Sequence, residues 1–122
     1  MSETCGMKNW VFSDGDLPPA GDKDPKGHEA LMITNVTTAN AKISIDILFE
    51  DKDPKKGITL ELGGERVVCI RLDQPIGVQG YSIPKGQYSL VLHSDVPVVA
   101  VFGRLDVRQP NLAYYSVQGY GY

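Results

Sequence analysis

Hydrophobic and polar side chains alternate along residues 97–109, and the alternation changes character partway. Side chains of a β-strand point to opposite faces in turn. One face stays apolar or small, with Val99, Val101, Gly103, Leu105 and Val107. The other is apolar at Val98, Ala100 and Phe102, then polar at Arg104, Asp106 and Arg108. The pattern therefore predicts a core strand whose far end enters a polar pocket or a subunit interface.

The same two-residue period predicts strands elsewhere in the chain. The expected strands are residues 10–12, 28–35, 41–49, 58–62, 65–72, 87–93 and 112–117, besides 97–109. Turn-forming residues separate them, with loops at 14–27 and 73–84, a Gly63-Gly64 hairpin and a short turn at 94–97. About eight short strands with regular turns and no helical pattern are typical of a sandwich. We therefore predict an all-β fold, a single antiparallel β-sandwich with jelly-roll-like connections.

The length of 122 residues fits one domain spanning the whole chain. We expect residues 1–8 and 118–122 to be flexible, with 119–122 as a frayed end or a tail that docks on a partner. A net charge of -3 provides no general attraction to nucleic acid, so we expect no such partner.

Cys5 and Cys69 lie far apart in the sequence without metal-binding spacing, and we predict two reduced thiols. The first residues lack the basic start and apolar run of a signal peptide. No apolar stretch approaches the roughly 20 residues that a membrane helix needs. We therefore expect a cytoplasmic protein.

Candidate binding residues begin with His28 and Glu29, which open a strand after a Gly- and Pro-rich loop. Neighbours on a strand face opposite ways, so only a bulge would bring both into one pocket. Each side chain either binds a ligand or satisfies backbone groups at the strand edge. With His93 as the only other histidine and no ligand-type spacing, we predict neither a metal site nor a cofactor.

Arginines provide the next candidates. Arg71, near a strand end, either projects a planar guanidinium toward a carboxylate, phosphate or hydroxyl pair, or is solvated. Arg104, Asp106 and Arg108 share one face, so Asp106 can pair with either arginine. This triplet forms either a salt-bridge network, within or between subunits, or a hydrogen-bonding array for a polyhydroxylated or acidic ligand. Trp10, the only tryptophan, either offers a flat face to a sugar or a cation or packs in the core or an interface.

No catalytic pattern is present in the sequence. The serines lie in no nucleophile elbow, and there is no phosphate-binding glycine loop. We predict that the protein is not an enzyme. If it were one, His28, Glu29 and Asp106 would be its acid/base groups.

Several short motifs, taken in order, resemble the sensory rhodopsin transducer family. They are Trp10 followed by Gly-Asp-Leu-Pro-Pro at 15–19, His28-Glu29 with Asn35, Arg66 and Arg71, Ser-Asp-Val-Pro at 94–97, and Arg-Leu-Asp-Val-Arg-Gln at 104–109. The resemblance implies a jelly-roll-like sandwich that assembles as a cyclic homotetramer, is cytoplasmic and has no enzymatic activity. It also implies binding of a sugar-like small molecule, or relay of a signal from a membrane photoreceptor.

Carried over to this chain, the resemblance implies a site made of eight residues. They are Trp10, His28, Glu29, Arg71, Ser94, Arg104, Asp106 and Arg108. Our leading hypothesis is a non-enzymatic signalling module that binds a polar small molecule such as a sugar. The alternative is an oligomeric adaptor for a membrane sensor such as a sensory rhodopsin, in which these charges hold the subunits together.

Overall fold

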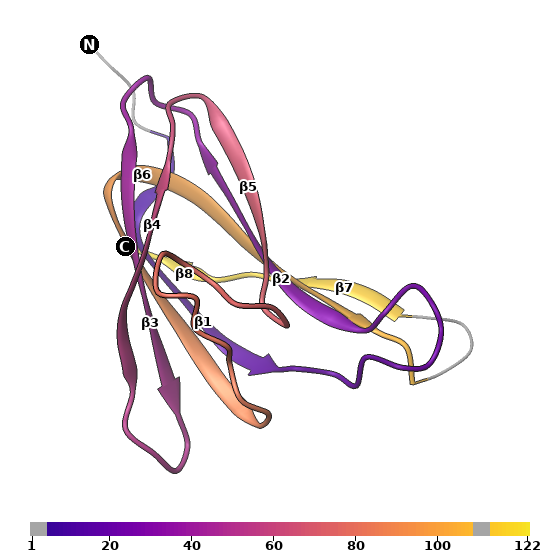
Figure 1. Ribbon diagram of the computed structural model, residues 1–122. Coiled ribbons are helices and arrows are strands. Elements are labelled where there is room, and N and C mark those ends of the chain that lie inside the picture. Colours follow the sequence, from indigo (N-terminus) through magenta and orange to yellow (C-terminus); the bar gives the residue numbers. More distant parts are fainter. Residues whose placement is uncertain (1–4, 109–112) are drawn as a thin grey trace.

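Eight antiparallel strands make up the computed structural model, which describes residues 5–108 and 113–122 (Figure 1). They are β1 (Met7–Asp16), β2 (His28–Asn35), β3 (Ala41–Phe49), β4 (Lys55–Leu62), β5 (Arg66–Arg71), β6 (Gln87–Asp106), β7 (Ala113–Val117) and β8 (Tyr120–Gly121). No helix occurs in the described ranges. The predicted all-β class is confirmed. The predicted strand positions at Gln109 and Leu112 lie outside the described residues.

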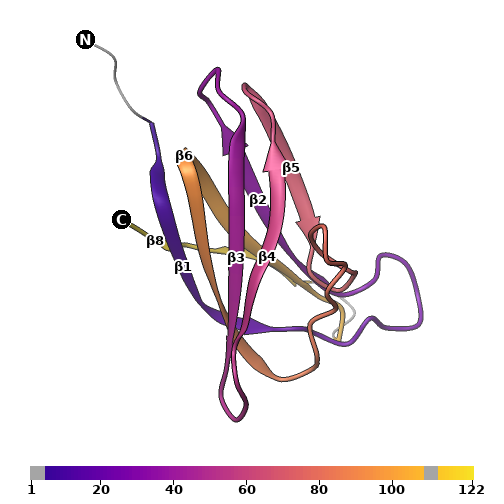
Figure 2. The ribbon, with the colours of Figure 1, turned by 60° about the vertical axis from the view of Figure 1, so that its left-hand side comes forward.

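Two layers of strands share β6, as Figures 1 and 2 show. The first layer has the order β4-β3-β6-β1-β8. In the second layer β2 pairs with β5 and β6, and β7 pairs with β6. The first half of β6 pairs with β1 and β3, and its second half pairs with β2 and β7. One continuous strand therefore connects the two layers of the sandwich.

The core lies between these layers and follows from the alternation in the sequence. β3 contributes Ile43, Ile45 and Ile47, and their neighbours Lys42 and Leu48 point outward and are exposed. Both layers contribute to one cluster, which also includes Phe12, Leu31, Ile33, Leu90, Leu92, Val98 and Phe102. Burial of such side chains contributes about 1.5–3 kcal/mol each to folding, which makes this cluster the main source of stability.

The turn expected at residues 94–97 was wrong, because β6 runs without a break across it. β1 pairs Met7 with Val98 but Asn9 with His93, so β6 carries extra residues at this point. The Asp95 carboxylate accepts a hydrogen bond from the Lys42 N–H at 2.8 Å. Pro97 has no N–H, and a bulge between two layers is a position where none is needed. The turn-forming residues thus mark a change of layer, not a change of direction.

The first and last strands include residues that the sequence predicted to be flexible. β1 extends beyond residues 10–12 to Met7–Asp16, so Asp14, Gly15 and Asp16 belong to a bulged strand rather than to a loop. At the other end, the expected frayed end or docking tail pairs as β8 with the chain's own β1. Gly119 lies so close to Phe12 that a Cβ would come within 2.4 Å of its ring. The alternating glycines therefore let β8 lie against this aromatic ring while the tyrosines point outward.

Candidate functional site

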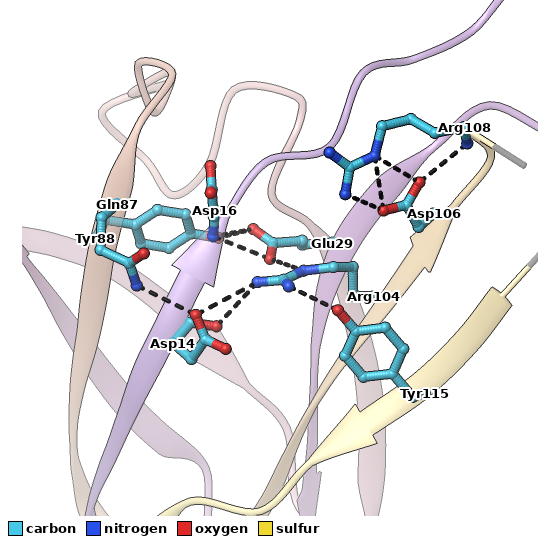
Figure 3. Close-up of polar contacts among 9 residues, drawn as sticks. All are labelled: Asp14, Asp16, Glu29, Gln87, Tyr88, Arg104, Asp106, Arg108 and Tyr115. Atoms are coloured by element: carbon cyan, nitrogen blue, oxygen red, sulfur yellow. Dashed lines mark hydrogen bonds and ion pairs between the residues drawn. The ribbon is translucent and has the colours of Figure 1, made fainter.

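A buried carboxylate, Glu29, organises the polar end of the sandwich (Figure 3). Its neighbour His28 faces the other way and is only half-buried, as strand geometry requires. Glu29 accepts hydrogen bonds from the Tyr88 hydroxyl at 2.6 Å and from Arg104 Nε at 2.7 Å. The Asp16 N–H is 3.1 Å from both carboxylate oxygens. The buried charge is thus paired with a cation and also hydrogen-bonded, which is the condition for its burial.

Gly15 makes this arrangement possible. It lies at the bulge in β1 opposite Tyr88, and a Cβ there would be 2.4 Å from the phenol ring. Without a side chain at this position, the ring can pass β1 and reach Glu29. The Asp-Gly-Asp sequence at residues 14–16 therefore helps to bind the buried carboxylate.

Arg104 extends the network from Glu29 to the surface. Its Nη1 donates to the Tyr115 hydroxyl at 2.6 Å, and its Nη2 donates to the Asp14 carbonyl at 3.2 Å. The guanidinium also lies 5.5 Å from the centre of the Tyr115 ring, where a cation–π attraction adds to the hydrogen bond. The Arg104 side chain is only 13% exposed. The inward face of β6, which changes from Phe102 to Arg104, therefore ends in an internal salt bridge.

The network shifts the pKa of two of its members. Burial, reinforced by donation to Glu29, raises the pKa of Tyr88 far above its usual range. Burial alone would lower the pKa of Arg104, but the hydrogen bond and charge of Glu29 outweigh it and raise the pKa. Tyr88 therefore stays neutral as a donor, and Arg104 stays a cation.

Asp106 and Arg108 form a separate pair near this end of the sandwich. Arg108 Nε lies 3.0 Å from both Asp106 oxygens, Nη2 contacts the same carboxylate, and the Arg108 N–H donates to it at 2.9 Å. These hydrogen bonds, the side-chain ones first, lower the pKa of Asp106 to about 2. Of the two partners open to Asp106, it takes Arg108, because Arg104 is held by Glu29.

The other expected site residues lie elsewhere. Arg71 is on the outward side of β5 and forms a bidentate pair with Asp73 at 2.8 and 2.9 Å. His28 Nδ1 bonds the Lys26 carbonyl at 2.8 Å. Trp10 donates to the Val98 carbonyl at 3.0 Å, and Ser94 is buried within β6. Of the eight residues, the structure brings Glu29 together with Arg104, and Asp106 together with Arg108.

Four members of the network were missed by sequence reasoning: Asp14, Asp16, Tyr88 and Tyr115. Tyr88 carried a signal, because it shares an inward face with Leu90 and Leu92 and a buried phenol needs a polar partner. Asp14 and Asp16 act largely through backbone groups, which the sequence does not reveal.

The second notable surface is the outward face of β2, β5, β6 and β7, which we call the outer apolar face. It carries Met32, Val67, Cys69, Val99, Val101 and Tyr114. Val67 is 66% exposed, Val101 37% and Tyr114 60%. Contiguous exposed apolar side chains are unusual on a monomer and mark interaction surfaces.

Within residues 5–108 and 113–122, no group of three or more His, Cys, Asp or Glu side chains is placed to hold a metal ion. The described part of the chain also contains no helix long and apolar enough to cross a membrane.

The eight antiparallel strands in two layers define a small all-β protein of the sandwich class. The particular family follows from sequence comparison. Residues 5–121 match the family of the Anabaena sensory rhodopsin transducer, and the chain belongs to it. No curated protein is significantly similar to the chain in sequence.

Two solved structures are similar along most of their length. The crystal structure of Thermotoga maritima 1070 is 32% identical, with a TM-score of 0.82 and 96% coverage of both chains. The Anabaena sensory rhodopsin transducer is 27% identical, with a TM-score of 0.74, and the match covers 89% of this chain and 96% of that one. The expected family is therefore confirmed.

Proposed function

We propose that this protein is a non-enzymatic, cytoplasmic signal transducer that works by binding other proteins. The outer apolar face carries the proposal, because its valines are exposed among the described residues. Membership of the transducer family supports the signalling role. The family's name supports a membrane sensor, such as a sensory rhodopsin, as the upstream partner.

The charged groups of the Glu29 network are already hydrogen-bonded to one another, which supports binding over catalysis as the function. Glu29 accepts from three donors, and Arg104 contacts Glu29, Tyr115 and Asp14. A substrate that needed these groups would have to break hydrogen bonds to a buried charge, each contributing about 1.5–3 kcal/mol. The network therefore stabilises the end of the sandwich rather than reacting.

The occupant that we propose for the outer apolar face is a second copy of this chain, within a homotetramer. Removing such a face from water favours association by roughly 25 cal/mol per Å² of apolar area. Val67 on β5 and Val99 and Val101 on β6 flank β2, whose Thr34 and Met32 lie between them on the same face.

Multi-angle light scattering after size exclusion tests this self-association. Val101→Asp places a charge at the centre of the face and is expected to reduce the mass of the assembly. Leu48→Asp is the matched control, because Leu48 is 41% exposed on the outward side of β3, in the other layer. A monomeric wild-type protein, or equal effects of the two variants, would contradict the proposal.

A polar small molecule, such as a sugar, is the second candidate for function. The observation that favours it is the exposed polar end of the sandwich, where Asp14, in the Glu29 network, is 61% exposed and Arg108, in the neighbouring pair with Asp106, is 66% exposed. Exposed carboxylate and guanidinium groups at one end of the sandwich suit a ligand with several hydroxyls. A thermal-shift screen of sugars tests this, with hits repeated on Arg108→Gln. The absence of hits, or hits unaffected by Arg108→Gln, would remove this candidate.

A further inference from the structure

A cavity lies against β3 and β4, which run side by side in the first layer (Figure 2). We call it the β3–β4 cavity. Its volume is about 320 Å³, near the lower end of the roughly 300–1,000 Å³ that is typical of small-molecule sites. Four of its lining residues are polar and pair across the two strands, Lys42 with Glu61 and Ser44 with Thr59. The cavity therefore has room for a small molecule and polar groups to hold it.

The register of the two strands brings these four side chains close together on the outward face. The Thr59 N–H and carbonyl bond residues 79 and 78, so they point away from β3. Hydrogen-bonded and non-hydrogen-bonded pairs alternate along an antiparallel ladder, so Ser44–Thr59 and Lys42–Glu61 are both non-hydrogen-bonded pairs. Side chains are closest in such pairs, with Cβ atoms about 4.5–5.5 Å apart. An ammonium and a carboxylate therefore leave the sheet next to each other, beside two hydroxyls.

The two charged groups of the cavity are available to a ligand. Lys42 and Glu61 are both exposed, and within residues 5–108 and 113–122 neither forms an ion pair, even with the other. The Glu61 carboxylate accepts one long hydrogen bond, from the Asn40 side chain at 3.4 Å. A ligand can therefore reach both charges without breaking an ion pair of the described chain.

An apolar side chain, Val78, forms one wall of the cavity and is 83% exposed. Its loop is fastened to the edge of β4. The Val78 N–H donates to the Thr59 carbonyl at 2.8 Å, and the Gln79 side chain bonds both the Thr59 N–H at 2.9 Å and its hydroxyl at 3.0 Å. Ile76 and Tyr81 close the loop with two backbone hydrogen bonds, at 2.9 and 3.0 Å. The valine is therefore held in place beside the polar groups, with its apolar surface uncovered.

We propose that the β3–β4 cavity binds a free α-amino acid with a branched apolar side chain, such as leucine. The ligand carboxylate accepts from the Lys42 ammonium and the Ser44 hydroxyl, the ligand ammonium donates to the Glu61 carboxylate, and the ligand side chain covers Val78. Both charges of an α-amino acid are attached to one carbon, so a single small ligand meets two neighbouring, opposite charges. The inference goes beyond the proposed self-association, because this cavity is in the first layer and the outer apolar face is in the second.

Titration of the isotope-labelled full chain with L-leucine, followed by NMR and calorimetry, tests the ligand. We expect the amide signals of Ser44, Thr59 and Val78 to shift. Three probes each lack one part of leucine: 4-methylpentanoate lacks the ammonium, 3-methylbutylamine lacks the carboxylate, and glycine lacks the apolar side chain. Each is expected to bind with a dissociation constant at least about tenfold higher than that of leucine.

Substitutions test the two charged residues. Lys42→Met and Glu61→Gln each remove one charge and keep most of the side chain, and each should raise the dissociation constant for leucine at least about tenfold. Lys8→Met and Glu50→Gln are the matched controls, because both residues are exposed and neither lines the cavity. The controls should bind leucine as the wild-type protein does. Circular dichroism and thermal unfolding establish that all four variants fold.

The outcomes separate this inference from the proposed function. No signal shift and no heat with millimolar leucine would overturn the amino-acid site and leave the self-association, which light scattering measures, standing. Equal binding of leucine and 4-methylpentanoate, or equal effects of Lys42→Met and Lys8→Met, would also overturn it. Arg108→Gln, at the polar end of the sandwich, should leave leucine binding unchanged, and a loss of binding there would place the ligand elsewhere and overturn the inference.

Discussion

Replacing Arg104 by methionine tests whether the internal salt bridge holds the sandwich end together. Methionine keeps much of the apolar stem of arginine but removes the guanidinium. Glu29 would then remain fully buried with only the Tyr88 hydroxyl and the Asp16 N–H as donors. The substitution therefore removes the positive charge and keeps most of the packing around it.

The expected loss follows from the burial of the pair. Glu29 is 0% exposed and the Arg104 side chain 13% exposed. Removing one partner of a buried pair costs about 3–5 kcal/mol, because the other charge is left uncompensated. That is a large part of the roughly 5–15 kcal/mol by which a domain of this size is stable. Removing both charges, in Glu29→Gln with Arg104→Met, should cost less than removing Arg104 alone.

Urea unfolding followed by the fluorescence of Trp10 measures the effect. With a denaturant slope of about 2 kcal/mol per M, the midpoint of Arg104→Met should fall by roughly 2 M. Arg108→Met is the matched control, because Arg108 is exposed and its hydrogen bonds and ion pair within the described residues are with Asp106. Because the Asp106–Arg108 pair is largely exposed, the midpoint of this variant should fall by much less. If the two variants shift the midpoint alike, or if the double variant is no more stable than Arg104→Met, the reasoning is refuted.

Three further outcomes follow from the geometry. Tyr88→Phe removes one hydrogen bond to the buried carboxylate and should cost about 1.5–3 kcal/mol in the same urea experiment, whereas Tyr81→Phe should cost less. The Asp106 carboxyl has a pKa of about 2 in the folded state, below its ordinary 3.8, so its contribution to stability is present above pH 4 and is lost as the pH falls toward 2. An NMR titration should show the Asp106 carboxyl titrating with a midpoint near that pKa, and Arg108→Ala should move the midpoint back up. Gly119→Ala would put a methyl group 2.4 Å from the Phe12 ring, so β8 should detach and the Asn9 amide should exchange its hydrogen faster, which Gln118→Ala should not cause.

The strands were predictable because their alternation is governed by one buried face. The bounds of β2 and β3 agree with the expected ranges 28–35 and 41–49. β6 was predicted as two strands because Ser94, Asp95 and Pro97 are ordinary turn residues. In the folded protein the same residues accommodate a bulge, and only the neighbouring layer distinguishes a bulge from a turn. Local sequence therefore located the irregularity but not its geometry.

The candidate site was predictable only in part, for a related reason. Charged residues on a strand face that was otherwise apolar pointed correctly to an inward Arg104. Its partner, Glu29, was recognised as a candidate but not as its ion pair, because that pairing depends on the register between β2 and β6. Arg71 pairs with the carboxylate of Asp73, two residues away in the sequence, and this pairing needs no tertiary structure. Long-range register was the missing information.

The shared strand β6 has a consequence for how the protein is made. β1, β2 and β3 all pair with β6, yet residues 87–106 come last among these four strands. During synthesis, β1, β2 and β3 therefore keep unpaired edges and exposed isoleucines until β6 leaves the ribosome. Folds dominated by such distant pairings form slowly, on the scale of milliseconds to seconds. Premature release before residue 106 would leave both layers without their common strand, and the nascent chain would depend on chaperones until then.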